Sequence, residues 1–594
     1  MGTSGGRAIA RWPGKGPMLE ARQHAGLERL HDLSQPVRPV PEPGLKPLPD
    51  WGPTQDWMPE LGRAPGTTEG LAPDWAPEPG WEQARHWHPE PERYAPCRRA
   101  KRRGWLLLAV LAVQAALCLR LVWSNTAFQD EALYLWAGHL EWSHWLYGAP
   151  IPAFQNQFSG APVIYPPLGA LADSFGGLAS ARLLSLFFML VATSLLYGTT
   201  RRMFDQRAAL FAAALFAGLG ASQFLGAFAT FDAMAIALLA LASWLGVRAA
   251  AAGRRVRRFS LMLAGAALAL ANATKYASGL FDPVVIAVAM ACIWRRRGVG
   301  AAAGGGAVML MTCAAFIGIG LKVGGSGYWL GFTSTTLTRT DGNIPAFGIL
   351  YASAEWVGGI AFLAVLGAIA SFAKRFSRPV RALTCVLVTA VFLAPAEQGR
   401  IHTITSLFKH VGFGAWFGCI VAGFALACLV TAVPALKAGA AVRVGIAATA
   451  LGAVLGAAMA SSHFSSWPRS TSFTARLEAL AKKYRGPVLE DNNVPEYYIP
   501  DLHWRRRAGT VKFSYIDPKT GRKLSGPSAY LDAIKHGYFS IIDLSFASTI
   551  QDDKKITRDI SITRTYRLAA VIPYEVNGVR AAYKIWVRDP AENE

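Results

Sequence analysis

The sequence predicts a mainly α fold: a polytopic membrane protein with about eleven transmembrane helices, followed by a small C-terminal α/β domain. Of the 594 residues, 52% are hydrophobic and only 16% are charged, whereas a soluble domain is usually about 25% charged. Between residues 98 and 462, apolar stretches of about 17 to 24 residues alternate with short polar breaks, and a helix needs that length to cross a bilayer. These observations exclude an ordinary soluble protein.

Residues 1–97 are expected to form a disordered cytoplasmic tail. They contain 17 of the 35 prolines, and proline at that density cannot sustain the interior of helices or sheets. No short apolar core follows a basic start, so the segment does not resemble a cleavable signal peptide. Its six tryptophans could form a docking tail, but an unstructured extension is the simpler interpretation.

Residues 98–462 form the predicted membrane domain. The candidate spans are 105–123, 178–200, 208–226, 229–247, 259–273, 277–293, 301–322, 349–372, 380–396, 411–432 and 443–461. Tight joints between neighbouring spans leave the count open by one or two. The spans are rich in Gly and Ala, which lets helices pack closely in lipid.

The positions of Lys and Arg predict the orientation of this domain. Six basic runs fall at every second loop, and together they contain 22 Lys or Arg and one acidic residue. The runs lie at 98–103, 201–207, 248–258, 295–297, 374–381 and 437–443. By the positive-inside rule the N-terminus is cytoplasmic, and an odd number of spans places the C-terminal part outside. The net charge of +22 is therefore mainly an orientation signal, and we expect no nucleic-acid partner.

Residues 463–594 are predicted to be an extracytoplasmic α/β domain. A helical pattern over 473–484 precedes a short apolar strand at 487–490. A second helical pattern over 528–536 precedes a strand at 538–544, and residues 581–588 alternate like a strand.

The first outer loop, about residues 124–177, contains the first candidate for chemistry, the pair Asp130 and Glu131. The simplest interpretation of Asp130 is an N-cap, whose carboxylate accepts the free amides of the helix that follows. The alternative is a carboxylate at the membrane–water boundary, where partial desolvation favours general-base catalysis.

Four segments together resemble the GT-C superfamily of membrane glycosyltransferases, which use lipid-phosphate-linked sugars and include protein O-mannosyltransferases and lipid A aminoarabinose transferases. They are Asp-Glu-Ala-Leu-Tyr at 130–134, Tyr-Pro-Pro-Leu at 165–168, Arg-Leu-Leu-Ser at 182–185 and Thr-Phe-Asp-Ala at 230–233. The resemblance covers about residues 100–430. Tyr165 stands where many members have His, and the loop around 323–350 matches no motif of the family.

The resemblance implies transfer of a sugar from a polyprenyl-phosphate donor to an envelope acceptor, which is a protein, a glycan or a lipid. It implies that Asp130, with Glu131 beside it, takes the proton of an acceptor hydroxyl that attacks the anomeric carbon with inversion. Tyr134, Tyr165 and Asp232 are then expected to bind the acceptor or the sugar.

The leaving lipid phosphate gains negative charge, so such a site needs cations. Basic residues on the predicted outer side are scarce, and six of them are candidates for binding the donor phosphate: Arg182, Lys275, Arg400, His402, Lys409 and His410. For Lys275, snorkelling to the interface is an equally good interpretation.

No cofactor is required by the sequence. There is no His/Cys metal spacing, although the carboxylates of Asp130, Glu131 and Asp232 could hold a divalent cation. Two alternatives to the enzyme remain. One is a transporter or flippase, which the lack of a convincing internal repeat disfavours. The other is a non-catalytic protein of envelope assembly.

Overall fold

The computed structural model describes residues 104–589 except 157, 340, 433–437, 500–501, 503–506, 510–513, 518–519 and 548. The expected disordered tail, residues 1–97, and the first basic run lie outside the described residues. The described residues form the membrane domain and the C-terminal domain.

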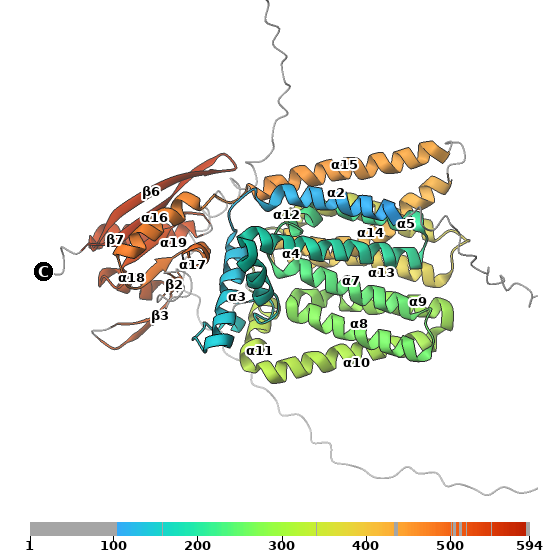
Figure 1. The fold of residues 1–594 in the computed structure, drawn as a ribbon, viewed down its shortest axis with the longest axis horizontal. Helices are drawn as coiled ribbons and strands as arrows, with labels where there is room; N and C mark the ends of the chain where they lie inside the picture. Colours follow the sequence, from blue (N-terminus) through green and yellow to red (C-terminus); the bar gives the residue numbers. More distant parts are fainter. Residues whose placement is uncertain are drawn as a thin grey trace, which may run out of the picture. The chain divides into compact units, whose positions relative to one another are not determined.

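The membrane domain is a bundle of helices that lie side by side (Figure 1). Its helices are α2 (Gly104–Val122), α3 (Gln129–Tyr147), α4 (Tyr165–Met203), α5 (Gln206–Gly218), α6 (Gly220–Leu225), α7 (Phe231–Ala249), α8 (Arg254–Thr274), α9 (Asp282–Arg297), α10 (Val299–Gly324), α11 (Ser326–Phe332), α12 (Ala346–Ser371), α13 (Arg378–Arg400), α14 (Leu407–Ala432) and α15 (Ala438–Phe464). A short 3₁₀ segment, η4 (Tyr276–Phe281), joins α8 to α9.

Within the described residues, nine helices are long and apolar enough to cross a membrane, rather than the eleven expected. The span expected at 208–226 is broken at Leu219, whose backbone is extended, into α5 and α6. The span expected at 259–273 is the C-terminal part of α8, whose first turns carry the basic residues of the run at 248–258. Both α5 and α8 nevertheless lie within the bundle (Figure 1).

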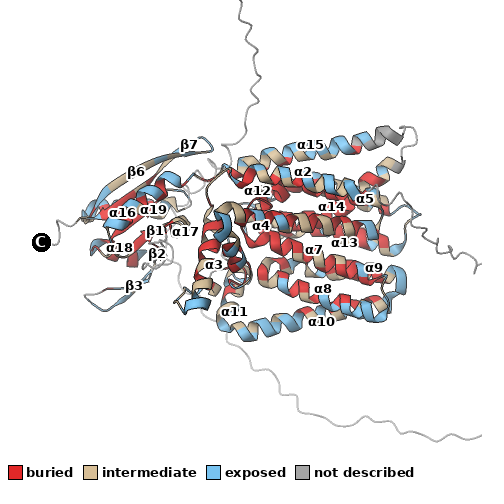
Figure 2. Cartoon of the chain, viewed as in Figure 1, coloured by how far each residue is buried: buried red, intermediate tan, exposed pale blue. Residues whose placement is uncertain are grey.

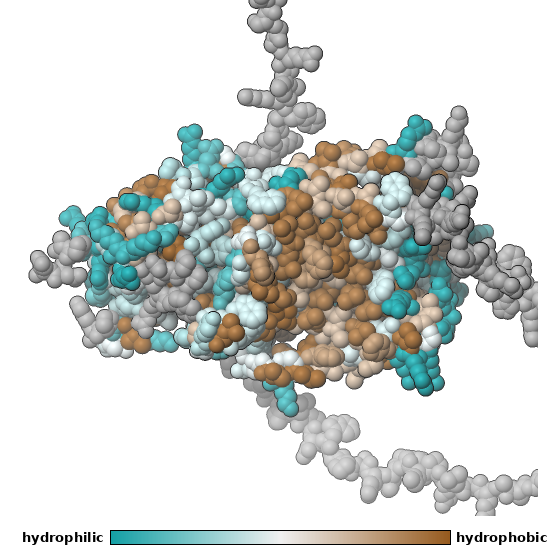
Figure 3. Space-filling view, viewed as in Figure 1, coloured by the Kyte–Doolittle hydropathy of each residue, from teal (hydrophilic) through white to brown (hydrophobic). Residues whose placement is uncertain are grey.

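The surface of the bundle confirms a multi-pass membrane protein. Helices α7 and α14 are mostly buried at its centre, whereas α10 and α15 are largely exposed (Figure 2). Large apolar side chains of these outer helices are exposed, among them Phe316, Ile319 and Leu455. On the face shown in Figure 3, an apolar band runs across the middle of the bundle, as a hydrocarbon environment requires.

Helix α3 does not belong to the spans, because it lies in the segment between the first two spans and packs against the first part of α4. Gly138 makes this close approach possible. A Cβ atom there would lie only 2.0 Å from the carbonyl oxygen of Pro166. Helix α4 then bends at Gly176 and Gly177, where Gly177 adopts φ 64°, and continues as the second span.

The small C-terminal α/β domain is confirmed. Its elements are α16 (Thr471–Lys483), β1 (Val488–Glu490), α17 (Val494–Tyr498), β2 (Arg507–Gly509), β3 (Ser514–Ile516), β4 (Lys523–Ser525), α18 (Pro527–Lys535), β5 (Ile541–Leu544), α19 (Ile550–Thr563), β6 (Tyr566–Val576) and β7 (Val579–Arg588). The main sheet has the order β2-β1-β5-β7-β6. Strand β1 is parallel to β2 and β5, and β7 is antiparallel to β5 and β6. Strand β6 had no counterpart in the sequence prediction.

Candidate active site

A cavity of about 1360 Å³ lies beside the N-terminal end of α3. Its walls come from α3, residues 158–164, the end of α8, η4, α10, α11, residues 334–339, α13 and residues 401–413 at the start of α14. The charged and polar lining includes Asp130, Lys275, Arg339, Arg400, Gln398 and His410, and the rest of the wall is mostly apolar. A site of this composition suits an amphipathic ligand with one anionic or polar end.

Asp130 faces this cavity from the first turn of α3. The helix begins at Gln129, and the residue at the N-cap is Phe128, so the interpretation of Asp130 as a cap is wrong. Instead, Lys409 Nζ donates to Asp130 Oδ2 across 2.5 Å. The start of α14 thus brings a cation directly to the first acidic motif.

Glu131 points away from the cavity and is completely buried. Its carboxylate accepts four hydrogen bonds: from Arg182 Nε (2.8 Å), Arg182 Nη2 (2.7 Å), the Ala229 amide (2.8 Å) and the Phe128 amide (3.0 Å). A carboxylate has about four lone-pair sites, so none is left for a substrate. The geometry does not support a direct chemical role for Glu131.

Arg182 is equally buried. Besides holding Glu131, its guanidinium donates to the carbonyls of Val122, Asn125 and Thr126. Arg182 does not line the cavity, so the expected contact with a donor phosphate is not supported either. The pair ties the end of α2 to α3, α4 and the start of α7.

The second acidic motif forms another ion pair. Asp232 Oδ1 lies 3.2 Å from Lys275 Nζ, and Thr230 Oγ1 donates to Asp232 Oδ2 across 3.0 Å. Lys275 also lies 4.6 Å from the centre of the Phe231 ring. Since Lys275 is only 2% exposed, it does not snorkel to the interface; it lines the cavity, whereas Asp232 lies behind it.

The two tyrosines of the motifs differ in their surroundings. Tyr134 lines the cavity, and its ring centre lies 4.4 Å from that of Phe231 and 5.1 Å from that of Phe158. Tyr165 is fully buried and packs edge-on against Phe231. Only Tyr134 is placed to touch a ligand.

The basic residues between positions 400 and 410 lie in different surroundings. Arg400 lines the cavity but is paired with Glu397 at 2.7 Å. His402 has a left-handed backbone (φ 52°), and its Nδ1 lies 3.0 Å from the Ile344 carbonyl oxygen, outside the cavity lining. His410 Nδ1 contacts the Gln398 amide at 2.9 Å, and its buried Nε2 has no hydrogen-bond partner among the described residues. His410 is therefore the histidine of the cluster that can serve a ligand.

Arg339 is a site residue that sequence reasoning missed. It lines the cavity from the loop before α12, and its Nη2 makes a long hydrogen bond of 3.4 Å to the Thr405 carbonyl oxygen. Burial lowers the pKa of Arg339, and the negative charge of Asp130 opposes that shift. It has no ion-pair partner among the described residues. The sequence signal that could have identified Arg339 is its position among the few basic residues on the predicted outer side. No motif marked the loop that contains it.

The carboxylates that could have held a metal are engaged with cations. Asp130 pairs with Lys409, Glu131 with Arg182 and Asp232 with Lys275. A divalent cation would have to displace these side chains, so the set does not fit a metal as it lies.

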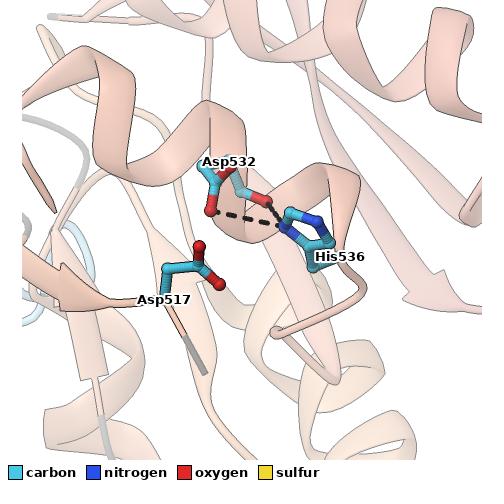
Figure 4. Close-up of side chains that lie close together, drawn as sticks. All are labelled: Asp517, Asp532 and His536. Atoms are coloured by element: carbon cyan, nitrogen blue, oxygen red, sulfur yellow. Dashed lines mark hydrogen bonds and ion pairs between the residues drawn. The ribbon is translucent and has the colours of Figure 1, made fainter. Parts of the chain in front are cut away.

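A group that does bring metal-ligating atoms together lies in the C-terminal domain: Asp517, Asp532 and His536 (Figure 4). His536 Nδ1 lies 3.0 Å from the Asp532 carbonyl oxygen and 3.3 Å from Asp532 Oδ2. Because a carbonyl can only accept, this nitrogen carries a proton and is not a metal ligand in this arrangement. We assign no metal there.

Comparisons with known proteins bear on the family resemblance and on the fold. Residues 170–318 match the family model of dolichyl-phosphate-mannose-protein mannosyltransferase. A search of curated proteins gives no match. Among solved structures, ArnT from Cupriavidus metallidurans bound to undecaprenyl phosphate is 15% identical, with a TM-score of 0.53 over 81% of this chain and 98% of that chain.

The apo form of that ArnT is 16% identical, with a TM-score of 0.52 and the same coverage. The apo oligosaccharyltransferase from Archaeoglobus fulgidus is 14% identical, with a TM-score of 0.52 over 81% of this chain and 74% of that chain. The chain thus has a fold like that of these GT-C membrane glycosyltransferases, and the resemblance that the motifs indicated is confirmed.

Proposed function

We propose that the chain is a membrane glycosyltransferase that moves a sugar from a polyprenyl-phosphate donor to a hydroxyl group of an envelope acceptor at the outer face of the membrane. The observation that carries this proposal is the position of Asp130 in the wall of a largely apolar cavity that also presents Lys275, Arg339 and His410. A base and several cations around one cavity are what transfer from a lipid phosphate requires.

Asp130 acts as the general base in this proposal. An acceptor hydroxyl donates a hydrogen bond to the carboxylate, which takes its proton as the oxygen attacks the anomeric carbon. The bond between that carbon and the phosphate oxygen breaks, and the polyprenyl phosphate leaves as a monoester. Attack opposite the leaving phosphate inverts the anomeric carbon. Lys409, at 2.5 Å, orients the carboxylate.

The leaving phosphate is bound by Arg339, Lys275 and His410. Arg339 is the best candidate for contacting the phosphate, because the other lining cations already pair with carboxylates. Lys275 pairs with Asp232, and Arg400 pairs with Glu397. The guanidinium can donate two parallel hydrogen bonds to a phosphate. Of the six phosphate-binding residues expected from the sequence, Lys275 and His410 stay in this role.

Apolar side chains of α10, among them Phe316, Ile317 and Leu321, line the same cavity. They offer a surface for the prenyl chain next to the membrane. The sugar and the acceptor would then meet between Asp130 and Tyr134. We place this end of the bundle, and the C-terminal domain, outside the cell on the basis of the basic loops at the other end.

The test uses the purified full-length protein in proteoliposomes. Decaprenyl-phosphate [¹⁴C]mannose and the matching arabinose lipid serve as donors, and an envelope extract from a strain that lacks the gene serves as acceptor. Asp130→Asn should lower transfer by a factor on the order of 100 or more, with unchanged gel-filtration behaviour.

The matched control is Asp205→Asn. Asp205 caps α5 by accepting from the Ala208 amide, and Asn caps equally well, so this variant should keep full activity. Full activity of Asp130→Asn would refute the proposed base. Movement of labelled lipid across the bilayer without transfer would instead favour a flippase.

A further inference from the structure

The peptide that leads into Asp130 is held on several sides. Arg182 binds the carbonyls of Asn125 and Thr126. The linker after α15 adds the Trp467 indole, which donates to the Thr126 carbonyl at 3.1 Å, and the Ser470 amide, which donates to Thr126 Oγ1 at 3.0 Å. The backbone amide of Ala127, in the same stretch, has a hydrogen-bond partner that lies farther away in the sequence.

That partner is Tyr498 of α17 in the C-terminal domain. The Ala127 amide donates to Tyr498 Oη across 2.8 Å, three residues before Asp130. Ala127 is 2% exposed, so its N–H would be buried without a partner if the phenol oxygen were removed, and an unsatisfied buried donor drives a local shift.

The neighbouring residue, Tyr497, binds α4 instead. Its hydroxyl donates to Asp173 Oδ1 across 2.6 Å, and Asp173 Oδ2 lies 2.7 Å from His139 Nε2 on α3. The Tyr497 side chain packs against the two buried clusters to which Tyr134 and Leu135 of α3 belong. A chain of hydrogen bonds thus links α17, α4 and α3.

The sheet of the C-terminal domain fixes α17. This helix follows β1 directly, and the Val494 amide at its start donates to Asn492 Oδ1 across 3.0 Å. The preceding residue, Asp491, accepts from the Ser545 amide at 2.6 Å after β5. Two parallel strands therefore set the position of the two tyrosines.

We infer that Tyr497 and Tyr498 are positioning residues for Asp130, so that the C-terminal domain contributes to the geometry of the active site. The inference rests on the proposed function. Neither hydroxyl touches the cavity; each acts through the backbone or the helix that carries the base. A small displacement of a catalytic group is enough to slow a reaction without weakening substrate binding.

The test compares Tyr497→Phe and Tyr498→Phe with Tyr484→Phe as the matched control. Tyr484 lies in the same domain, and its hydroxyl accepts from Arg567, away from α3. Each of the first two variants should lower kcat on the order of 10-fold, while KM for the polyprenyl-phosphate sugar stays within about twofold. The control should retain the wild-type kcat.

The readouts separate a positioning role from a merely structural one. If the hydroxyls served only stability, the melting temperature would fall while kcat per folded molecule stayed constant, and that result would overturn the inference. An unchanged kcat in both variants would overturn it as well. Full activity of Asp130→Asn would refute the proposed function, on which this inference rests. If Asp130→Asn is inactive while both tyrosine variants keep the wild-type kcat, only this inference is refuted.

Discussion

Replacing Glu131 by glutamine should lower the folding stability of the protein rather than remove a group that takes part in catalysis. The Glu131–Arg182 pair has both side chains at 0% exposure, and the carboxylate accepts four hydrogen bonds. A glutamine amide nitrogen would place a donor against other donors, and the Arg182 charge would remain buried without a counter-charge. Breaking a buried pair in this way costs about 3–5 kcal/mol.

The assay is thermal or denaturant unfolding of the purified protein in detergent, with undecaprenyl phosphate binding as a second readout. Glu141→Gln is the control, because Glu141 lies on the same helix and is also buried, yet makes no ion pair among the described residues. Burial raises the pKa of Glu141, so removing its charge should cost less than about 1 kcal/mol. A Glu131→Gln protein with wild-type stability and no activity would refute the structural assignment and return Glu131 to the chemistry.

Two further predictions concern the phosphate site and the C-terminal domain. Arg339→Ala should weaken binding of undecaprenyl phosphate by about 10- to 100-fold, since hydrogen bonds to charged groups contribute about 1.5–3 kcal/mol. The control, Arg400→Ala, should weaken binding by less than about threefold. Equal losses of affinity in a radioligand assay would contradict the assignment of Arg339 to the phosphate. Burial, followed by the charge of Asp491, raises the pKa of Asp553 to about 7 from 3.8. The folded state therefore favours the protonated acid, and stability that is present below about pH 4 is lost as the pH rises towards about 7 and above. Hydrogen exchange of α19, corrected for intrinsic rates, should show this loss in the wild type and a flatter profile in Asp553→Asn; a wild-type profile that is flat would refute it.

The sequence predicts the membrane domain well because hydropathy and loop charge act locally. Each expected span falls mainly on helix, and the break within 208–226 depends on one extended residue, Leu219. No periodicity marks such a break, because residues on both sides of it are equally apolar.

The motifs locate the site, but they do not assign a role to each residue. Arg182 and Arg339 are chemically identical, and only the fold decides that the first binds Glu131 while the second faces the cavity. Likewise, the partner of Asp130 is Lys409, 279 residues later. Composition can indicate that a cation is present, but it cannot say which acid the cation meets.

That long separation has a consequence for biogenesis. Synthesis and membrane insertion proceed from the N-terminus, so α3 is in place well before α14 emerges from the ribosome. Asp130 therefore lacks its partner until one of the last helices has entered the bilayer, whereas Asp232 meets Lys275 after about one further helical hairpin. In a nascent chain stalled before Lys409 the Asp130 carboxylate has no such partner, so the Asp130–Lys409 pair can close only once α14 has joined the bundle.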